Sequence, residues 1–182
     1  VLLIGDIITN VLEQKGHKLI HIDTYHDIPS YNKSYAKSLN TARNQLDSEK
    51  NLKVILDVHR DGIREDASYR DKAVKQSKIK IDGKNVATFS LVVGSASPNY
   101  NKVLEFAKYI KAVSDKMYPG LCKGIIIKPM VKFNQFLSDY SALLEVGSNL
   151  NTVDEAKESA KVIGEILDVV IESIQEWLRY LF

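Results

Sequence analysis

Apolar positions recur at helical spacing in several parts of the chain, which predicts a set of helices. The first spans residues 4–15, the second 34–46 and the third 101–117. The last spans about 152–181 and opens with Thr152 and Glu155 at the spacing of a capping box. Its apolar stripe is expected to pack on a sheet, or to reach a partner through its final apolar residues, which are Trp177, Leu178, Leu181 and Phe182.

Short β-like runs separate these helices. Predicted strands cover residues 17–23, 53–58, 124–127 and 141–146, and Asp82-Gly83 between two β-rich runs predicts a hairpin over 78–93. This order predicts an α/β fold in which helices are layered around a mostly parallel mixed sheet, with the hairpin as an insertion. The length of 182 residues fits a single domain over 1–182. Because the chain enters directly at a helix, we expect it to be part of a longer protein.

The composition excludes several classes of protein. The net charge is +2 and the lysines are spread along the chain, so no footprint of a nucleic-acid-binding protein is visible. The chain contains no run of about 18 uninterrupted apolar residues, so no membrane span is expected. A single cysteine, Cys122, rules out an internal disulfide framework.

One predicted strand leads into Asp57 and His59, which carry the first candidate chemistry. Functional groups collect at the carboxyl ends of parallel strands. Residues two apart on a strand point to the same side, so Asp57 is placed to orient His59. A carboxylate beside a histidine fixes its tautomer and strengthens it as a metal ligand. The alternative is that His59 only caps the strand in a hydrogen-bonded loop.

A second predicted strand leads into Glu145. An acid directly after Ser141-Ala142-Leu143-Leu144 is expected to be buried, and buried carboxylates are rare unless they are paired or functional. Burial raises the pKa of a carboxyl group toward the range of a general base. The alternative is an ion pair with a lysine or arginine. If Glu145 and His59 share one cleft, they predict a hydrolase that uses metal-bound water.

Other polar side chains are candidates to complete such a site. His26 follows a predicted strand end, and Asn134 and Gln135 lie in a loop before the Glu145 strand. Arg60 is a candidate to hold a substrate carboxylate or oxyanion, or to pair with Asp61. The remaining reactive residues are expected to be structural, and these are His17, His21 and Cys122.

Several ordered stretches carry a more specific signal, and they cover residues 26–35, 54–61, 92–94, 118–121, 133–135 and 143–149, with Asn151. Together they resemble the stage II sporulation protein P family, a group of zinc-dependent, N-acetylmuramoyl-L-alanine amidase-like cell-wall hydrolases. The resemblance runs from about Gly5 to the last helix. It implies an amidase-like fold, with His59 matching a zinc-binding histidine and Glu145 matching the catalytic glutamate.

The resemblance also implies a biological setting. Family members look like amidases that cut between muramic acid and the first L-alanine of peptidoglycan stems, and an endopeptidase activity on crosslinks is also described. They act during engulfment of the forespore, on the cell-wall side of the membrane, with a lytic transglycosylase as partner. The full-length parent is accordingly expected to be membrane-anchored.

One part of the family pattern has no match in this chain. The family begins with a strand ending in a His-Thr-His-type motif with a nearby glutamate, which supplies the remaining zinc ligands. We therefore expect the first strand and those ligands to be missing here, which would leave this fragment inactive. The alternatives are that His26 substitutes as a ligand or that the protein binds no metal. A non-catalytic cell-wall binding or scaffolding module and a generic zinc peptidase also stay open.

Overall fold

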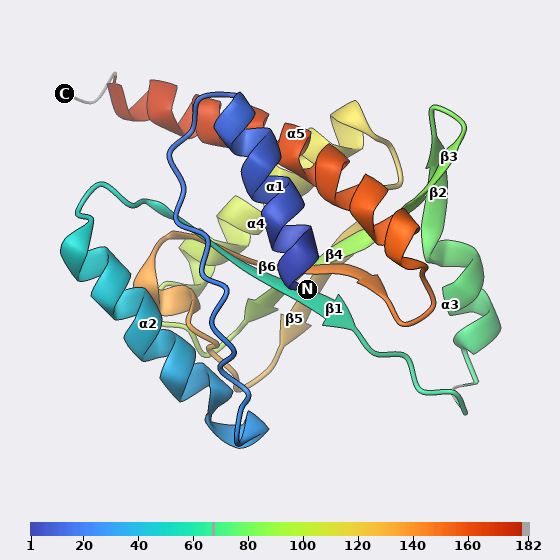
Figure 1. Ribbon diagram of the computed structural model, residues 1–182, viewed down its shortest axis with the longest axis horizontal. Coiled ribbons are helices and arrows are strands. Elements are labelled where there is room, and N and C mark those ends of the chain that lie inside the picture. The colour runs from blue at the N-terminus through green and yellow to red at the C-terminus, as the bar shows by residue number, and fades with distance from the viewer. Residues whose placement is uncertain (67, 180–182) are drawn as a thin grey trace.

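A mixed sheet lies at the centre of the computed structural model, which describes residues 1–66 and 68–179 (Figure 1). Within that part of the chain the strand order is β1-β6-β4-β5. Two of the three pairings, β1 with β6 and β4 with β5, are parallel, whereas β4 runs antiparallel to β6. The predicted mostly parallel mixed sheet is therefore confirmed. Its strands are β1 (Val54–Asp61), β4 (Phe89–Gly94), β5 (Cys122–Lys128) and β6 (Tyr140–Ser148).

One face of this sheet packs on the long helices. Alternate residues of the central strands, such as Leu91 of β4 and Leu144 of β6, are fully buried in the main hydrophobic core. That core also includes residues of α1 (Leu2–Gln14), α4 (Tyr100–Met117) and α5 (Val153–Arg179), and α1 packs against α5 (Figure 1). The opposite face carries His59 and Glu145, since side chains alternate between the two faces of a sheet. Near that face lies α2 (Ser34–Ser48), whose Tyr35 stacks on His59.

The predicted hairpin is confirmed as β2 (Lys78–Ile81) and β3 (Lys84–Ala87), which pair antiparallel. Asp82 and Gly83 both have positive φ, as the tight two-residue hairpin turn requires. The second half of the predicted hairpin is split at Thr88, after which the chain enters the main sheet as β4. The sequence reading missed the short helix α3 (Arg70–Gln76), which has too few apolar positions to show a helical stripe.

The predicted strand over residues 17–23 is wrong. This segment has no regular secondary structure and pairs with no strand of the described chain. Side chains anchor it instead: the imidazole of His17 bonds the Asp168 carboxylate on α5 at 2.7 Å, and that of His21 lies 3.1 Å from Asp6 on α1. The His21 ring lies so close to Gly5 that a Cβ there would approach it to 2.5 Å. The two histidines therefore hold this segment against α5 and α1, and of its apolar residues Leu19 packs against the core.

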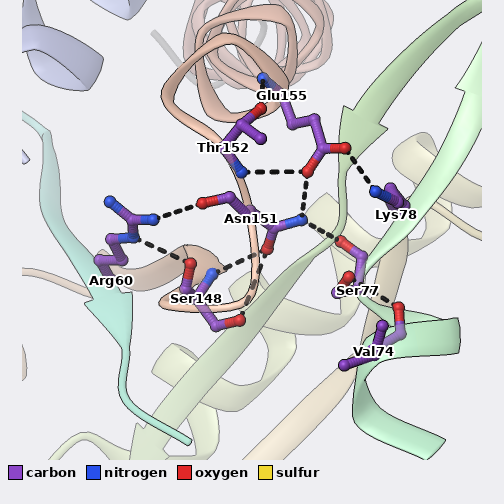
Figure 2. Close-up of polar contacts among 8 residues, drawn as sticks. All are labelled: Arg60, Val74, Ser77, Lys78, Ser148, Asn151, Thr152 and Glu155. Carbon is purple, nitrogen blue, oxygen red and sulfur yellow. Dashed lines mark hydrogen bonds and ion pairs between the residues drawn. The ribbon is translucent and has the colours of Figure 1, made fainter. Parts of the chain in front are cut away.

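The boundaries of α1, α4 and α5 agree closely with the predicted ranges, because the apolar stripes that define these helices face the core. Those of α2 also agree, although none of its residues is buried. The capping box at the start of α5 is present: Thr152 Oγ1 accepts from the Glu155 N–H and Glu155 Oε2 accepts from the Thr152 N–H, both at 3.1 Å (Figure 2). In the described residues no helix is long and apolar enough to span a bilayer. The predicted partner-contacting residues at the end of α5 lie outside the residues whose side chains are described; these are Trp177, Leu178, Leu181 and Phe182.

Replacing Glu155 with alanine is expected to lower the free energy of unfolding by about 2–4 kcal/mol at pH 7, because one buried and one partly buried donor lose their charged acceptor. These donors are Asn151 Nδ2 and the Thr152 N–H. Burial by itself raises the pKa of Glu155, but hydrogen bonds from Lys78, Asn151 and Thr152 outweigh it and lower that pKa below 4.5. Stability from this carboxylate is therefore present above pH 4.5 and is lost as the pH falls through the lowered folded-state pKa.

Urea unfolding followed by circular dichroism at pH 7 and at pH 3.5 tests this prediction. The difference between the wild type and Glu155→Ala should shrink at the lower pH. Glu158→Ala is the matched control, because Glu158 lies on the same helix and forms ion pairs with Lys84 and Lys161. Such partly exposed pairs contribute about 0–1 kcal/mol. A loss no larger than that of the control would contradict the prediction.

Candidate active site

His59 and Glu145 lie opposite one another on neighbouring parallel strands. The ladder between β1 and β6 pairs His59 directly with Glu145. Residues paired in this way project from the same face of a sheet, with strands about 4.8 Å apart. Both side chains are partly exposed. The arrangement on which the hydrolase hypothesis depends, an imidazole and a carboxyl group side by side at a solvent-reachable surface, is therefore present.

Asp57 holds the imidazole of His59. Its Oδ1 lies 2.9 Å from His59 Nε2, as the period of the strand predicted. The hydrogen bond to Asp57 is the main reason that the pKa of His59 is raised, and the charges of Asp57 and Glu145 add to this against the opposing effect of burial. Because Nε2 faces Asp57, Nδ1 is the ring nitrogen that a metal ion would use if it bound here.

Glu145 is a carboxyl group in a partly buried setting. Burial is the main cause of its raised pKa; nearby His59 lowers that pKa, while Asp61 and Asp57 raise it. Its Oε2 is buried and has no hydrogen-bond partner among the described residues. The alternative role, as half of an ion pair, is thus not seen at this oxygen. A carboxyl group with a raised pKa and a free oxygen is suited to take up and release a proton.

One aromatic ring lies against His59, and a second ring lies against the first. The ring of Tyr35, at the start of α2, is stacked on the imidazole with a centroid distance of 6.4 Å. The Phe133 ring lies 5.5 Å from Tyr35. Sequence reasoning did not single out Tyr35, although it belongs to the stretch 26–35 that carries the family resemblance. On the other flank, Glu145 lines a shallow depression with Asp61, Ser90 and Lys123.

The other predicted substrate-binding residues make structural contacts. His26 Nε2 bonds Thr41 Oγ1 of α2 at 2.9 Å. Asn134 donates to Ser38 Oγ of α2 at 2.8 Å. The amide of Gln135 is buried and bonds the main chain of β4 at Val92 and Gly94. These three residues therefore position α2 and the loop after β5, which together carry Tyr35 and Phe133 to the site.

Arg60 projects from the face opposite His59, since it is the next residue on β1. Its guanidinium donates to the main-chain oxygens of Ser148 and Asn151, at 2.9 and 2.7 Å. These contacts give it a role between strands, on the side away from Glu145, and the predicted contact with substrate stays a prediction.

The side chains at this site are of a kind that binds zinc, but there are too few of them to complete a zinc site. His59, held by a carboxylate, has the chemistry of a zinc ligand. A catalytic zinc takes three protein ligands and a water, however. In the described part of the chain no group of three or more His, Cys, Asp or Glu side chains is arranged to hold a metal ion, so His26 does not join His59 in such a group. These residues therefore provide at most one part of a zinc site.

Comparisons with known proteins show which family this chain belongs to. The family model for stage II sporulation protein P (SpoIIP) matches residues 1–168. The stage II sporulation protein P of Bacillus subtilis (strain 168) is 31% identical over 178 residues, and the match covers 91% of this chain. The match covers 42% of that relative, so the chain spans about two fifths of its length.

Two solved amidases share the fold. The CwlD amidase from Clostridioides difficile, solved in complex with the GerS lipoprotein, superposes with a TM-score of 0.59 over 96% of this chain and 84% of its own. The N-acetylmuramoyl-L-alanine amidase AmiC2 of Nostoc punctiforme gives 0.54 over 96% and 82%. Both are 13% identical in sequence, so the likeness concerns the fold alone. The predicted amidase-like fold is confirmed.

Proposed function

This chain belongs to the stage II sporulation protein P family, and we propose that it is the catalytic part of a zinc-dependent N-acetylmuramoyl-L-alanine amidase that hydrolyses peptidoglycan during sporulation. The observation that carries the proposal is the direct pairing of His59 with Glu145 on parallel strands. The amidase fold of the solved neighbours supports the same reaction class.

In the proposed reaction Glu145 is the general base and acid. It takes a proton from the attacking water and passes it to the leaving nitrogen of the amide, a role suited to its raised pKa and its unpaired Oε2. His59 is the zinc ligand of this chain, oriented by Asp57. Bound zinc would lower the pKa of its water toward about 7, and the further ligands would come from a part of the parent protein that this chain does not contain.

The wider setting is part of the same proposal. We place the parent protein on the cell-wall side of the membrane, anchored there, with peptidoglycan as substrate and a lytic transglycosylase of the engulfment machinery as partner. An endopeptidase activity on crosslinks would use the same two residues, because both reactions hydrolyse an amide. The CwlD amidase was solved with a lipoprotein, which supports a protein partner for this fold.

Digestion of purified peptidoglycan by the full-length protein tests the proposal. We expect release of stem peptides whose new amino terminus is L-alanine, identified by mass spectrometry. The activity should disappear in a chelator and return with added zinc. Free crosslinked peptides, digested in parallel, separate amidase from endopeptidase activity. Cleavage of ordinary peptides without stem release would indicate a generic zinc peptidase. Wall binding without any cleavage would indicate a non-catalytic module.

A further inference from the structure

The ladder between β1 and β6 contains an irregularity immediately after the candidate site. The register is constant from Val54–Tyr140 to His59–Glu145, and the next pair is Asp61 with Ser148. Asp61 lies two residues after His59, whereas Ser148 lies three residues after Glu145. The additional residue on β6 is a β-bulge, and bulges beside active sites change the direction in which a side chain points.

Gly147 provides the backbone conformation of this bulge. Its φ is +63°, in the left-handed region that favours glycine. A Cβ at this position would lie 3.2 Å from both the Ala87 Cβ and Asn151 Oδ1. The Gly147 N–H still donates to the Thr88 oxygen at 3.0 Å, so the bulge distorts the side of β6 that faces β1 while the contact toward β4 is kept.

Asn151 holds the bulge from the α5 side. Its side chain is buried, and Oδ1 accepts from the Ser148 N–H at 3.0 Å. Its Nδ2 donates to the Ser77 oxygen at 3.0 Å and to Glu155 Oε2 at 3.2 Å (Figure 2). Every hydrogen-bonding direction of this amide is therefore used, which restrains where Ser148 lies.

Arg60 closes the same bulge from the β1 side. Nε donates to the Ser148 oxygen and Nη2 to the Asn151 oxygen, so one guanidinium joins β1 to both ends of the turn that leads into α5 (Figure 2). A planar guanidinium can bind two acceptors in a fixed geometry, which an ammonium group cannot do. Arg60 is adjacent to His59, and Ser148 closely follows Glu145, so this contact ties together the ends of the two strands that carry the site.

We propose that Arg60 and Asn151 are positioning residues that fix the bulge in β6 and thereby set the position of the Glu145 carboxyl group relative to the His59 imidazole. This inference rests on the proposed function. Neither residue reaches the substrate in this role, because Arg60 lies on the opposite face of the sheet and Asn151 is buried. Their effect on the reaction is geometric, and a misplacement of about 1 Å can cost a factor of about 10² in rate.

Arg60→Lys in the full-length protein tests the inference through steady-state kinetics of stem-peptide release. We expect kcat to fall by about 10–100-fold while KM changes by less than about twofold. Asn151→Asp, which keeps the acceptor but loses the hydrogen bonds donated to Ser77 and Glu155, should act in the same direction. Arg64→Lys is the matched control, since Arg64 lies in the following loop and is exposed except for an ion pair with Asp66. An unchanged kcat, or a raised KM at constant kcat, would overturn the inference.

Hydrogen exchange gives a readout that does not depend on activity. In Arg60→Lys, a peptide covering residues 145–149 should exchange faster than in the wild type, while peptides from α4 should not change. If residues 145–149 exchange at the same rate in Arg60→Lys as in the wild type, the inference is overturned even if kcat falls. If the wild type releases no stem peptides, the proposed amidase function fails, whereas the exchange experiment still decides whether Arg60 holds the bulge.

Discussion

Replacing Glu145 with glutamine is expected to lower kcat for stem-peptide release by about 10²–10⁴-fold in the full-length protein, the usual contribution of a general base or acid. Glutamine has the same shape but cannot take the proton from water or return it to the leaving nitrogen. Bound zinc should stay in place, because the proposed ligand is His59. Kinetics on purified peptidoglycan, together with metal analysis of the same sample, measure both quantities.

The same substitution is expected to stabilise the protein at neutral pH. Burial raises the pKa of Glu145, so the fold favours the protonated form relative to the unfolded chain. The stability from this group is present below the ordinary pKa of 4.5 and is lost as the pH rises through the higher folded-state pKa. At pH 7 the wild type therefore carries the cost of a partly buried carboxylate, and Glu145→Gln removes it.

Glu105→Gln is the control for this experiment, because Glu105 is exposed on α4 and pairs with Lys102, one turn away. It should leave both kcat and the melting temperature unchanged. Undiminished cleavage by Glu145→Gln would remove this residue from the mechanism. A melting temperature at pH 7 below that of the wild type would show that the carboxylate has a stabilising partner.

Replacing His59 with alanine is expected to abolish activity and to lower the zinc content of the full-length protein well below one per chain. The reason is that a three-ligand site loses one ligand outright. Asp57→Asn should have a smaller effect of about 10–100-fold in metal affinity or activity, because the ligand remains but loses the carboxylate that orients it. Metal analysis after gel filtration and titration with a chelator measure the two effects.

A second histidine variant serves as the control for zinc binding. His21→Gln changes an imidazole that lies against α1 and Asp6, away from the strand ends. It should keep the zinc content and activity of the wild type. Full zinc occupancy in His59→Ala would exclude His59 as a ligand. An Asp57→Asn variant with unchanged zinc affinity would show that the hydrogen bond between Asp57 and His59 does not strengthen zinc binding.

The sequence predictions were correct where the deciding interactions lie between residues close together in the chain. The helices α1, α4 and α5 were predicted closely because each shows a complete apolar stripe within its own residues. The capping box and the Asp82-Gly83 turn are equally local. Residues 17–23 alternate like a strand, but a strand needs a partner, and in the described structure this segment packs on helices instead.

The sequence by itself determined the α/β class, the family, and the two strands that carry His59 and Glu145, because all of these follow from local patterns and ordered motifs. Only the tertiary structure decided what surrounds those residues. Arg60 meets Ser148 across 88 residues, and Asn134 meets the α2 residue Ser38 across 96. No local pattern encodes such contacts, since they depend on which strands lie side by side and which face each side chain takes. The bulge beside Glu145 has the same origin, because it exists only where β1 and β6 pair.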